Sequence, residues 1–259
     1  MNKGICILPL IPVRERPSDK TQMISQLLFG DVVQIKDRYK SWLFTETSHD
    51  SYAGWVDEKQ ISFPPAAFFE QIENEVPVFL SEKYADAHGK NGSRLSLVMG
   101  SRLPGFDKNT FYIGESNYKL SGSVHTLQGK QIPEIVIKTA KKFLGSPYLW
   151  GGRSYFGIDC SGFTQIVYRM CGYNLLRDSS QQAEHGLSVS FIEEAKPADL
   201  AFFEDEEGRI VHVGIMLSNR QIIHSSGQVR IDTIDHEGIF NEATKKYTHK
   251  LRFIKRFPA

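Results

Sequence analysis

Three side chains of this sequence could together perform nucleophilic catalysis: Cys160, His212 and His224. Cys160 lies in the segment Ile158–Thr164, directly before a helix-like run, and the two histidines follow in strand-like stretches. A thiol attacks as the thiolate, and the unpaired N–H groups at the start of a helix lower the pKa of a thiol there. The order of these residues therefore predicts a thiol nucleophile, its base and a group that orients the base.

The alternation of apolar residues places both histidines on one face of a β-hairpin. Valines flank His212 on both sides, so its side chain points to the face opposite theirs. A turn at Ser218–Arg220 then makes His212 and His224 either directly opposite or diagonal neighbours. In either register His212 can take the proton of Cys160 while His224 fixes the tautomer of His212. Two such histidines can also form a polar pair at a sheet edge, and it is Cys160 that favours catalysis.

The other cysteines and polar clusters predict neither a disulfide framework nor a metal site. The sequence has three cysteines, which fits a reduced compartment better than an oxidising one. Cys171 ends an apolar helix face and is interpreted as structural. Zinc sites typically show Cys-x2-Cys or His-x3-His spacing, which this sequence lacks, so we predict no metal and no cofactor. A downstream polar cluster is interpreted as a solvated loop: Asp232, Asp235 and His236.

Two helices followed by strands must position the candidate site. Pro133 fits the first turn of a helix that Gly145 ends, and a second helix is predicted at 161–171. The apolar face predicted for the first helix consists of Val136, Ala140, Phe143 and Leu144. Strands are predicted at 200–203, 210–217, 221–225 and 251–254. Helices first and strands afterwards predict an α+β domain.

The first half of the chain, to about residue 125, has the pattern of short strands. Strands are predicted at 32–35, 41–45 and 53–56, and a weak echo of their pattern returns about 70 residues later, with Gly30 matching Gly100. The echo predicts two small β-barrels that meet near Ser62–Ala66. The predicted domains are therefore 1–63, 64–128 and 129–259.

Composition limits the classes of partner. The net charge of +1 gives no reason to expect nucleic acid or a membrane surface, and 41% hydrophobic content is typical of a soluble globular protein. The apolar run at 5–11 is broken by Pro9 and is too short for a secretory signal. We expect a cytoplasmic monomer, although an exported protein trimmed of its signal would look the same.

Five motifs together resemble the NlpC/P60 cysteine peptidases over residues 130–258. In order, they are Tyr148–Gly152, Asp159–Phe163, Ala198–Phe203, His212–Ile215 and Ile223–Gly227. The resemblance implies a papain-like fold and bacterial cell-wall peptides as substrates, with Cys160 as nucleophile, His212 as base and His224 as the orienting residue. It also links Tyr148 to the oxyanion site. Ala198 departs from the glycine that the family often has there, which puts a turn in doubt rather than the chemistry.

The N-terminal half resembles tandem bacterial SH3 modules, and the combination resembles the γ-D-glutamyl-L-diamino-acid endopeptidases of the dipeptidyl-peptidase VI type. This implies a murein peptide substrate with a free N-terminal L-Ala, whose ammonium needs carboxylate and hydroxyl acceptors. A bound ammonium would also answer the charge of the carboxylate next to the thiol. The positions that the resemblance assigns to substrate binding are Asp159, Ser161, Ser179 and Trp150, with Tyr52 and Glu15 from the first module.

The predicted reaction is hydrolysis of the bond between γ-D-Glu and a diamino acid, releasing L-Ala-D-Glu. The alternatives are an exported hydrolase of intact peptidoglycan and a wall-binding SH3 protein whose peptidase domain is inactive. The sequence leaves the diamino acid open, either meso-diaminopimelate or lysine.

Overall fold

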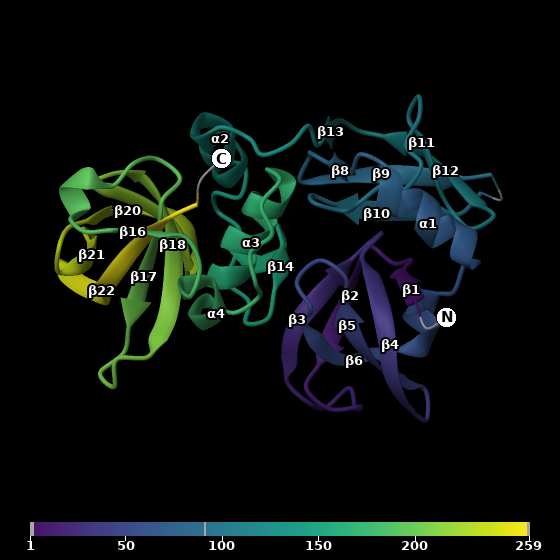
Figure 1. Cartoon of the computed structure of the whole chain (residues 1–259), viewed down its shortest axis with the longest axis horizontal. Helices are drawn as coiled ribbons and strands as arrows, with labels where there is room; N and C mark the ends of the chain where they lie inside the picture. Colours follow the sequence, from purple (N-terminus) through teal and green to yellow (C-terminus); the bar gives the residue numbers. More distant parts are fainter. Residues whose placement is uncertain (1–2, 91, 258–259) are drawn as a thin grey trace. The chain divides into compact units, whose positions relative to one another are not determined.

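The computed structural model describes residues 3–90 and 92–257, and the chain forms two compact units (Figure 1). The N-terminal unit comprises Met1–Gln128 and Trp150–Tyr155, and the C-terminal unit comprises Gly129–Leu149 and Phe156–Ala259. The segment Trp150–Tyr155 thus packs with the N-terminal unit, although it follows the first helix of the C-terminal unit. Within the described residues, every helix is too short or too polar to cross a membrane.

The first sheet of the N-terminal unit contains the strands predicted from the sequence. Its antiparallel order is β3-β2-β6-β5-β4-β1-β7. The bounds are β1 (Lys3–Cys6), β2 (Leu10–Arg14), β3 (Met23–Leu28), β4 (Val32–Tyr39), β5 (Trp42–Thr47), β6 (Ala53–Asp57) and β7 (Ile61–Ser62). Alternate residues of these strands point inward, as a half-buried sheet requires. The resulting core cluster is Cys6, Ile11, Val13, Leu27, Val33, Leu43, Val56 and Ile61.

A second set of strands and a helix complete this unit. A four-stranded sheet has the order β10-β9-β12-β11, and β13 pairs with β8. The bounds are β8 (Val78–Leu80), β9 (Tyr84–Gly89), β10 (Arg94–Val98), β11 (Thr110–Ile113), β12 (Ser116–Ser121), β13 (Val124–Thr126) and β14 (Arg153–Ser154). Helix α1 (Ala66–Asn74) was not predicted; Phe68, Phe69 and Ile72 form its buried face at helical spacing. Ile5 and Phe29 of the first half join the same apolar cluster, so the two halves share a core.

The predicted echo is visible in one recurring turn. Gly30 and Gly100 both have positive φ, +82° and +86°. The N–H of Gly30 donates to the Cys6 carbonyl at 3.0 Å, and the N–H of Gly100 donates to the Leu80 carbonyl at 3.0 Å. Glycine adopts this conformation without strain, which explains its return at the matching position. The two halves nevertheless differ in strand order, so the shared turn does not by itself make the second half another SH3-like barrel.

The C-terminal unit combines short helices with a long antiparallel sheet. The helices are α2 (Pro133–Lys141), α3 (Cys160–Met170) and α4 (Ser179–Ala183). The sheet order is β16-β22-β17-β18-β19-β20-β21, and β21 also pairs with β22, which closes the strands from β17 to β22 into a ring. The bounds are β15 (Gly157–Ile158), β16 (Leu187–Val189), β17 (Leu200–Glu204), β18 (Ile210–Ser218), β19 (Gln221–Ser226), β20 (Gln228–Ile234), β21 (Gly238–Asn241) and β22 (Lys246–Arg256). Helix α3 packs against β18 and β19 (Figure 1).

Both predicted helices are present, with two corrections. Helix α3 begins at Cys160 and ends before Cys171, and its side chains are buried all round rather than on one face. In α2, Val136 and Ala140 are buried as predicted, but Leu144 is 38% exposed because the helix ends at Lys141 and Leu144 lies in the following turn. The prediction also missed β20 and β21, and β20 carries a residue of the site.

Ala198 occupies the turn before β17 with φ of +70°. Only glycine adopts this left-handed region freely, and another residue there costs on the order of 1 kcal/mol. The turn is nevertheless kept, since the N–H of Ala198 donates to the Met216 carbonyl at 2.9 Å. Replacement of glycine by alanine has therefore strained the turn without removing it.

Candidate active site

Cys160 is the first residue of α3, and the residue before it caps the helix. Asp159 has extended backbone angles, and its side chain accepts a 2.6 Å hydrogen bond from the N–H of Gly162. This arrangement satisfies one of the unpaired donors of the first helical turn. The other two cysteines, Cys6 and Cys171, lie in a strand and at a helix C-terminus. Cys160 therefore differs from them by its place at the positive end of a helix.

The structure corrects the expected pKa of this thiol. Burial raises the pKa of Cys160 to about 12, and the charge of Asp159 adds to the increase. The backbone N–H groups of Val213 and Ser161 act in the opposite direction, because a donor stabilises the thiolate. The helix terminus is thus outweighed by the loss of hydration, and Cys160 is a neutral thiol in the free protein. The contact with Val213 also puts the sulfur beside the strand that carries His212.

A buried arginine answers the charge of Asp159. Arg177 is 1% exposed and donates to the two carboxylate oxygens of Asp159 at 2.6 and 3.1 Å. Its Nη1 also donates to Ser161 Oγ at 2.9 Å. Arg177 thus already compensates the charge of Asp159 in the free protein, and the predicted contact of Asp159 with a substrate ammonium stays a prediction.

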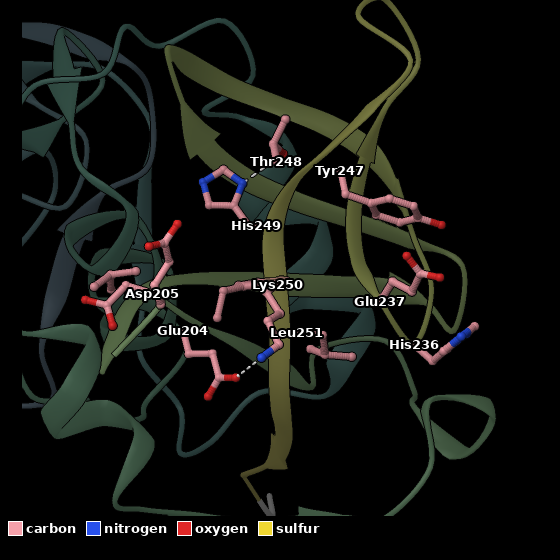
Figure 2. A pocket seen from close by; sticks show the side chains of 12 residues that line it. Glu204, Asp205, His236, Glu237, Tyr247, Thr248, His249, Lys250 and Leu251 are labelled. Atoms are coloured by element: carbon pink, nitrogen blue, oxygen red, sulfur yellow. Dashed lines mark hydrogen bonds and ion pairs between the residues drawn. The ribbon is translucent and has the colours of Figure 1, made fainter. Parts of the chain in front are cut away.

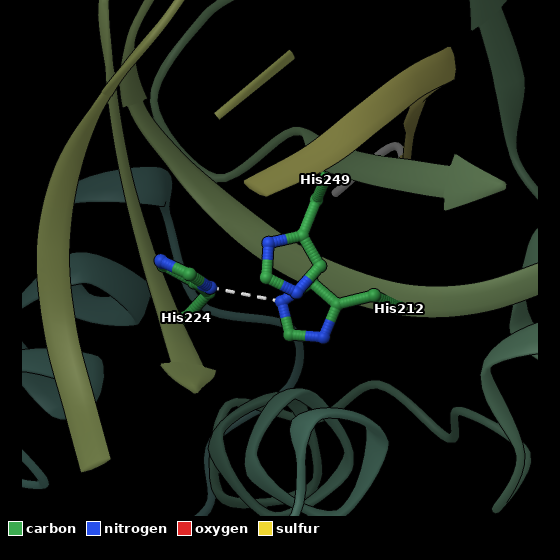
Figure 3. A group of neighbouring side chains, drawn as sticks. All are labelled: His212, His224 and His249. Carbon is green, nitrogen blue, oxygen red and sulfur yellow. Dashed lines mark hydrogen bonds between the residues drawn. The ribbon is translucent and has the colours of Figure 1, made fainter. Parts of the chain in front are cut away.

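The two histidines continue into a hydrogen-bonded chain (Figure 3). His212 Nε2 lies 2.8 Å from His224 Nδ1, the contact that Figure 3 draws. His224 Nε2 in turn lies 2.9 Å from Asp232 Oδ2. An ionised carboxylate only accepts, so His224 donates from Nε2 and keeps a lone pair on Nδ1. His212 must then donate from Nε2, which leaves its Nδ1 as the unprotonated nitrogen. The chain therefore fixes the tautomer that a base needs.

The strand register agrees with one of the two predicted arrangements. His224 pairs with Gly214, so His212 and His224 are diagonal neighbours across β18 and β19. Burial lowers the pKa of His212 well below 6.5, and the neighbouring His249 and His224 lower it further. His212 is therefore neutral at pH 7 and can accept a proton. Cys160 and His212 together offer a neutral thiol and a neutral imidazole.

Asp232 was predicted to lie in a solvated loop, and this was wrong. It lies in β20 opposite Ile222, with 8% of its surface exposed. Arg230 donates to it from Nη2 at 2.7 Å. Burial raises the pKa of Asp232, but the hydrogen bonds from His224 and Arg230 outweigh burial and hold it below the ordinary value. The sequence did contain a sign that Asp232 is buried: it lies two residues before the apolar Ile234, and residues two apart in a strand share a face.

His249 of β22 was also missed. Its ring stacks on that of His212 with a centroid separation of 4.1 Å and an interplanar angle of 27°. His249 further lines a cavity of about 890 Å3 whose rim is acidic at Glu204 and Glu237 (Figure 2). Lys250 pairs with Glu204 at 2.8 Å, so part of that negative charge is already answered.

The predicted residues of the C-terminal unit lie around Cys160. Tyr148 is 37% exposed; burial, followed by the electrostatic effect of the neighbouring Cys160 and Asp159, raises its pKa to about 12, so its hydroxyl stays protonated and can donate. Ser161 is buried beside the nucleophile, and Ser179 begins α4. Gln182 of α4 donates to the Ser161 carbonyl at 3.1 Å, which ties α4 to α3.

The remaining predicted positions belong to the N-terminal unit. Trp150 is 61% exposed, and Glu15 is exposed beside Arg16 at 3.7 Å. Tyr52 is half-buried, and its N–H donates to Asp50 Oδ1 at 3.1 Å. The contacts of these three side chains with a substrate stay predictions.

The arrangement of a helix-terminal thiol against strands that carry two linked histidines defines the class of protein. The NlpC/P60 family model matches residues 145–250, and the bacterial dipeptidyl-peptidase SH3 domain model matches residues 13–61. The chain belongs to the NlpC/P60 family of cysteine peptidases and carries an N-terminal bacterial SH3 domain.

Two dipeptidyl-peptidases are among the relatives to which this chain is similar. The chain is 32% identical over 217 residues to the γ-D-glutamyl-L-lysine dipeptidyl-peptidase of Bacillus subtilis, which covers 78% of this chain and 71% of the relative. It is 25% identical to dipeptidyl-peptidase 6 of Lysinibacillus sphaericus, over 90% of this chain and 92% of the relative. An NlpC/P60 family protein of Bacillus cereus has the same fold, with a TM-score of 0.81 at 21% identity over 98% of this chain and 99% of that chain.

Proposed function

We propose that this chain is a cysteine peptidase that hydrolyses the γ-D-Glu–diamino-acid bond of free murein peptides, releasing L-Ala-D-Glu. The observation that carries the proposal is the chain from Asp232 through His224 to His212, which leaves one unprotonated nitrogen on the strand that contacts the Cys160 sulfur. The similarity to γ-D-glutamyl-L-lysine dipeptidyl-peptidases supports the choice of bond.

The proposed reaction proceeds through a thioester. Cys160 Sγ attacks the γ-carbonyl of D-Glu while His212 Nδ1 takes the thiol proton. The C–N bond then breaks, and His212 returns the proton to the leaving amine of the diamino acid. A water molecule, deprotonated by His212, hydrolyses the thioester and restores the thiol. The backbone N–H of Cys160 and the Tyr148 hydroxyl are the proposed donors to the developing oxyanion.

The neutral state of both Cys160 and His212 in the free protein is compatible with this reaction. Because Cys160 is a thiol and His212 is unprotonated in the free protein, the thiol proton has an acceptor and passes to His212 before or during attack. Asp232 stabilises the positive charge that His212 acquires, through the intervening His224. The histidine chain thus supplies both the tautomer and the charge compensation.

Recognition of the peptide amino terminus is the second part of the proposal. Asp159, Ser161 and Ser179 are proposed acceptors for the ammonium of L-Ala, and Asp159 would share its carboxylate between Arg177 and the substrate. We further propose that Trp150, Tyr52 and Glu15 take part in substrate binding. The second half of the N-terminal unit is proposed to be another SH3-like module, on the basis of the recurring turn at Gly30 and Gly100.

Mass spectrometry of the cleavage products tests the proposal. L-Ala-γ-D-Glu-meso-diaminopimelate and the lysine analogue are each incubated with the protein, beside the same peptides with an acetylated amino terminus. We expect L-Ala-D-Glu from at least one free peptide and a rate lower by at least about 100-fold for its acetylated form, because a buried acceptor set loses its charged partner. Faster release from intact sacculi than from free peptides would instead favour a wall hydrolase.

A further inference from the structure

We propose that His212, His224 and His249 form a binding site for a divalent transition-metal ion, Zn2+ above all, and that the bound ion inhibits the peptidase. Each of the three offers one ring nitrogen within 4.8 Å of those of the other two (Figure 3). They come from β18, β19 and β22, which the closed sheet brings together. The metal site depends only on the histidine geometry, whereas its inhibitory effect rests on the proposed function.

In His224 and in His249, one ring nitrogen already has a hydrogen-bond partner, so the other nitrogen is the one available to a metal. His224 Nε2 donates to Asp232 Oδ2, so its Nδ1 keeps the lone pair. His249 Nδ1 lies 2.9 Å from Thr248 Oγ1, which leaves His249 Nε2 for a ligand. A histidine that binds metal through one nitrogen while the other donates to a carboxylate is the usual arrangement at zinc sites.

One of the three nitrogen–nitrogen spacings is close to that of a tetrahedral site, and the other two are no longer than 4.8 Å. Zn–N bonds of 2.0–2.1 Å place two ligand nitrogens about 3.3 Å apart. His212 Nε2 and His224 Nδ1 are 2.8 Å apart, so these two rings would move apart by roughly 0.5 Å. Three imidazoles leave the fourth position to water, as in catalytic zinc sites, and nitrogen ligands favour zinc over magnesium or calcium.

Metal binding and base function exclude each other at His212. A neutral imidazole carries one proton, and in the hydrogen-bonded chain that proton is on Nε2. When Nε2 binds the metal, the proton must move to Nδ1. Nδ1 can then no longer take the proton of Cys160, and the ion displaces the His212–His224 hydrogen bond. The metal-bound protein would therefore be inactive without any loss of fold.

A calorimetric zinc titration tests the site without reference to turnover. It uses the full chain with Cys160→Ala, so that a thiol cannot supply the binding. We expect one Zn2+ per chain, and binding weakened by at least about 100-fold when His249→Phe is added, because the phenyl ring keeps the stacking but offers no ligand. His249→Gln serves as a second variant should the phenyl variant not fold. His236→Phe, an exposed lining residue of the neighbouring cavity, is the matched control and should leave binding unchanged.

An inhibition assay on proteins with an intact thiol tests the consequence. Zinc should inhibit the EDTA-treated wild type and the His236→Phe control reversibly, whereas His249→Phe should require at least about 100-fold more zinc for the same fractional inhibition. Loss of zinc binding in Cys160→Ala, or undiminished binding in His249→Phe, would overturn the site. Stoichiometric binding without inhibition would overturn the inhibitory role alone. Absence of peptide cleavage before zinc is added would count against the proposed function, and the titration would still decide the site.

Discussion

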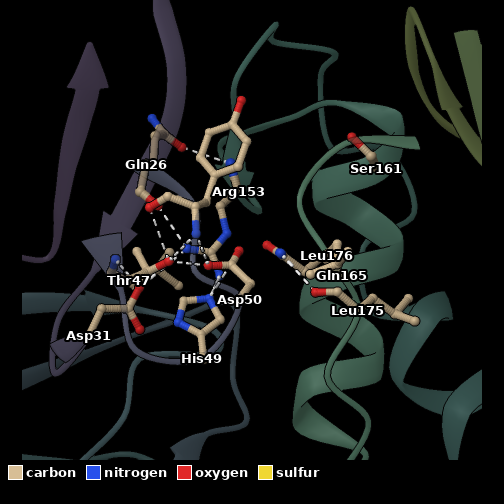
Figure 4. Close-up of polar contacts among 12 residues, drawn as sticks. Gln26, Asp31, Thr47, His49, Asp50, Arg153, Ser161, Gln165, Leu175 and Leu176 are labelled. Carbon is tan, nitrogen blue, oxygen red and sulfur yellow. Dashed lines mark hydrogen bonds and ion pairs between the residues drawn. The ribbon is translucent and has the colours of Figure 1, made fainter. Parts of the chain in front are cut away.

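Each unit contains a buried network of hydrogen-bonded polar side chains, and of these two networks only that of the C-terminal unit ends in an unprotonated nitrogen. The N-terminal unit contains a cluster around Arg153, which is 1% exposed (Figure 4). The C-terminal unit contains the chain from Asp232 to His212. In both, hydrogen bonds hold buried polar groups in place. Their chemistry is nevertheless different.

The Arg153 network closes on itself. Its backbone N–H donates to the Gln26 side chain at 2.8 Å, and its guanidinium donates to the Gln26 carbonyl at 2.7 Å and to Asp31 at 3.2 Å. The nearby charges of His49 and Arg153 hold the pKa of Asp50 below its ordinary value although burial acts to raise it. Such a network holds the segment Trp150–Tyr155 on the first sheet. Its charges stabilise one another, and we assign it no proton transfer.

The histidine chain instead has a direction. Asp232 accepts a hydrogen bond from His224 Nε2, and His224 Nδ1 accepts one from His212 Nε2. His212 therefore ends the chain with an unprotonated Nδ1. A proton added at that end is stabilised through the whole chain. The comparison suggests that a closed charged network serves stability, whereas two neutral imidazoles aligned by a carboxylate, with one free nitrogen at the end, serve proton transfer. The following predictions test that distinction.

Removing the thiol whose proton the open end accepts should have the largest effect on activity. Cys160→Ala should lower turnover of the murein peptide by at least about 10^4-fold, since a nucleophile has no substitute. The free energy of unfolding should change by no more than about 1 kcal/mol. Turnover is followed by mass spectrometry and stability by urea titration. Retained turnover would show that another group attacks.

Removing the centre of the closed network should affect stability instead. Arg153→Met leaves Asp31 as a buried charge without its guanidinium and should cost about 3–5 kcal/mol of unfolding free energy. The matched control is Arg38→Met, whose pair with Glu58 is exposed and should cost less than about 1 kcal/mol. Equal losses in the two variants would contradict the assignment of Arg153 to a stabilising network.

Sequence reasoning found the parts of the site that a local pattern encodes. Cys160 precedes a helix, and the parity of β18 and β19 places His212 and His224 on one face. These relations depend on neighbours within one helix or one hairpin, where the geometry follows from the period of the element. Helices α2 and α3, strands β17, β18, β19 and part of β22, and the α+β class could be predicted for the same reason.

The missing parts are those that only the closed sheet brings together. Asp232 and His249 reach the histidine pair from β20 and β22, and Arg177 reaches Asp159 from the loop before α4. Spacing along the chain carries no signal for such contacts, so the search for a metal motif could not find the three histidines. The prediction of a lowered pKa for the Cys160 thiol was wrong for a related reason. The burial that raises this pKa arises only from the tertiary fold.

Asp232→Asn should lower activity less than Cys160→Ala does, because it changes the tautomer of His212 and leaves the nucleophile in place. An amide can donate to His224 Nε2, which would reverse the chain and place the proton of His212 on Nδ1, the nitrogen that must accept. We expect kcat to fall on the order of 100-fold, less than the roughly 10^4-fold loss expected when the acid contacts the base directly. The amide keeps the shape of the carboxylate, so the free energy of unfolding should change little. An unchanged kcat would show that His212 does not depend on the chain for its tautomer.

The histidine cluster should also destabilise the protein in acid. Burial, followed by the charge of His224, lowers the pKa of His249 from 6.5 to about 4. The unfolded chain therefore binds a proton at His249 below pH 6.5 that the folded protein binds only near pH 4. The stability contribution of a neutral His249 is complete above pH 6.5 and is lost as the pH falls toward about 4. Allowing for its partial exposure, this loss should be about 1–2 kcal/mol.

Urea titrations between about pH 7 and pH 4, in EDTA so that no metal occupies the cluster, measure this dependence. His249→Phe should remove about 1–2 kcal/mol of the acid-dependent loss, because phenylalanine binds no proton in either state. His185→Phe, at an exposed histidine of the same unit, is the matched control and should leave the loss unchanged. If both variants keep the wild-type pH dependence, His249 is not the group whose protonation the fold resists. His212, whose ring stacks on that of His249, would then be the source, and the same titration of His212→Phe would show it by a smaller acid-dependent loss.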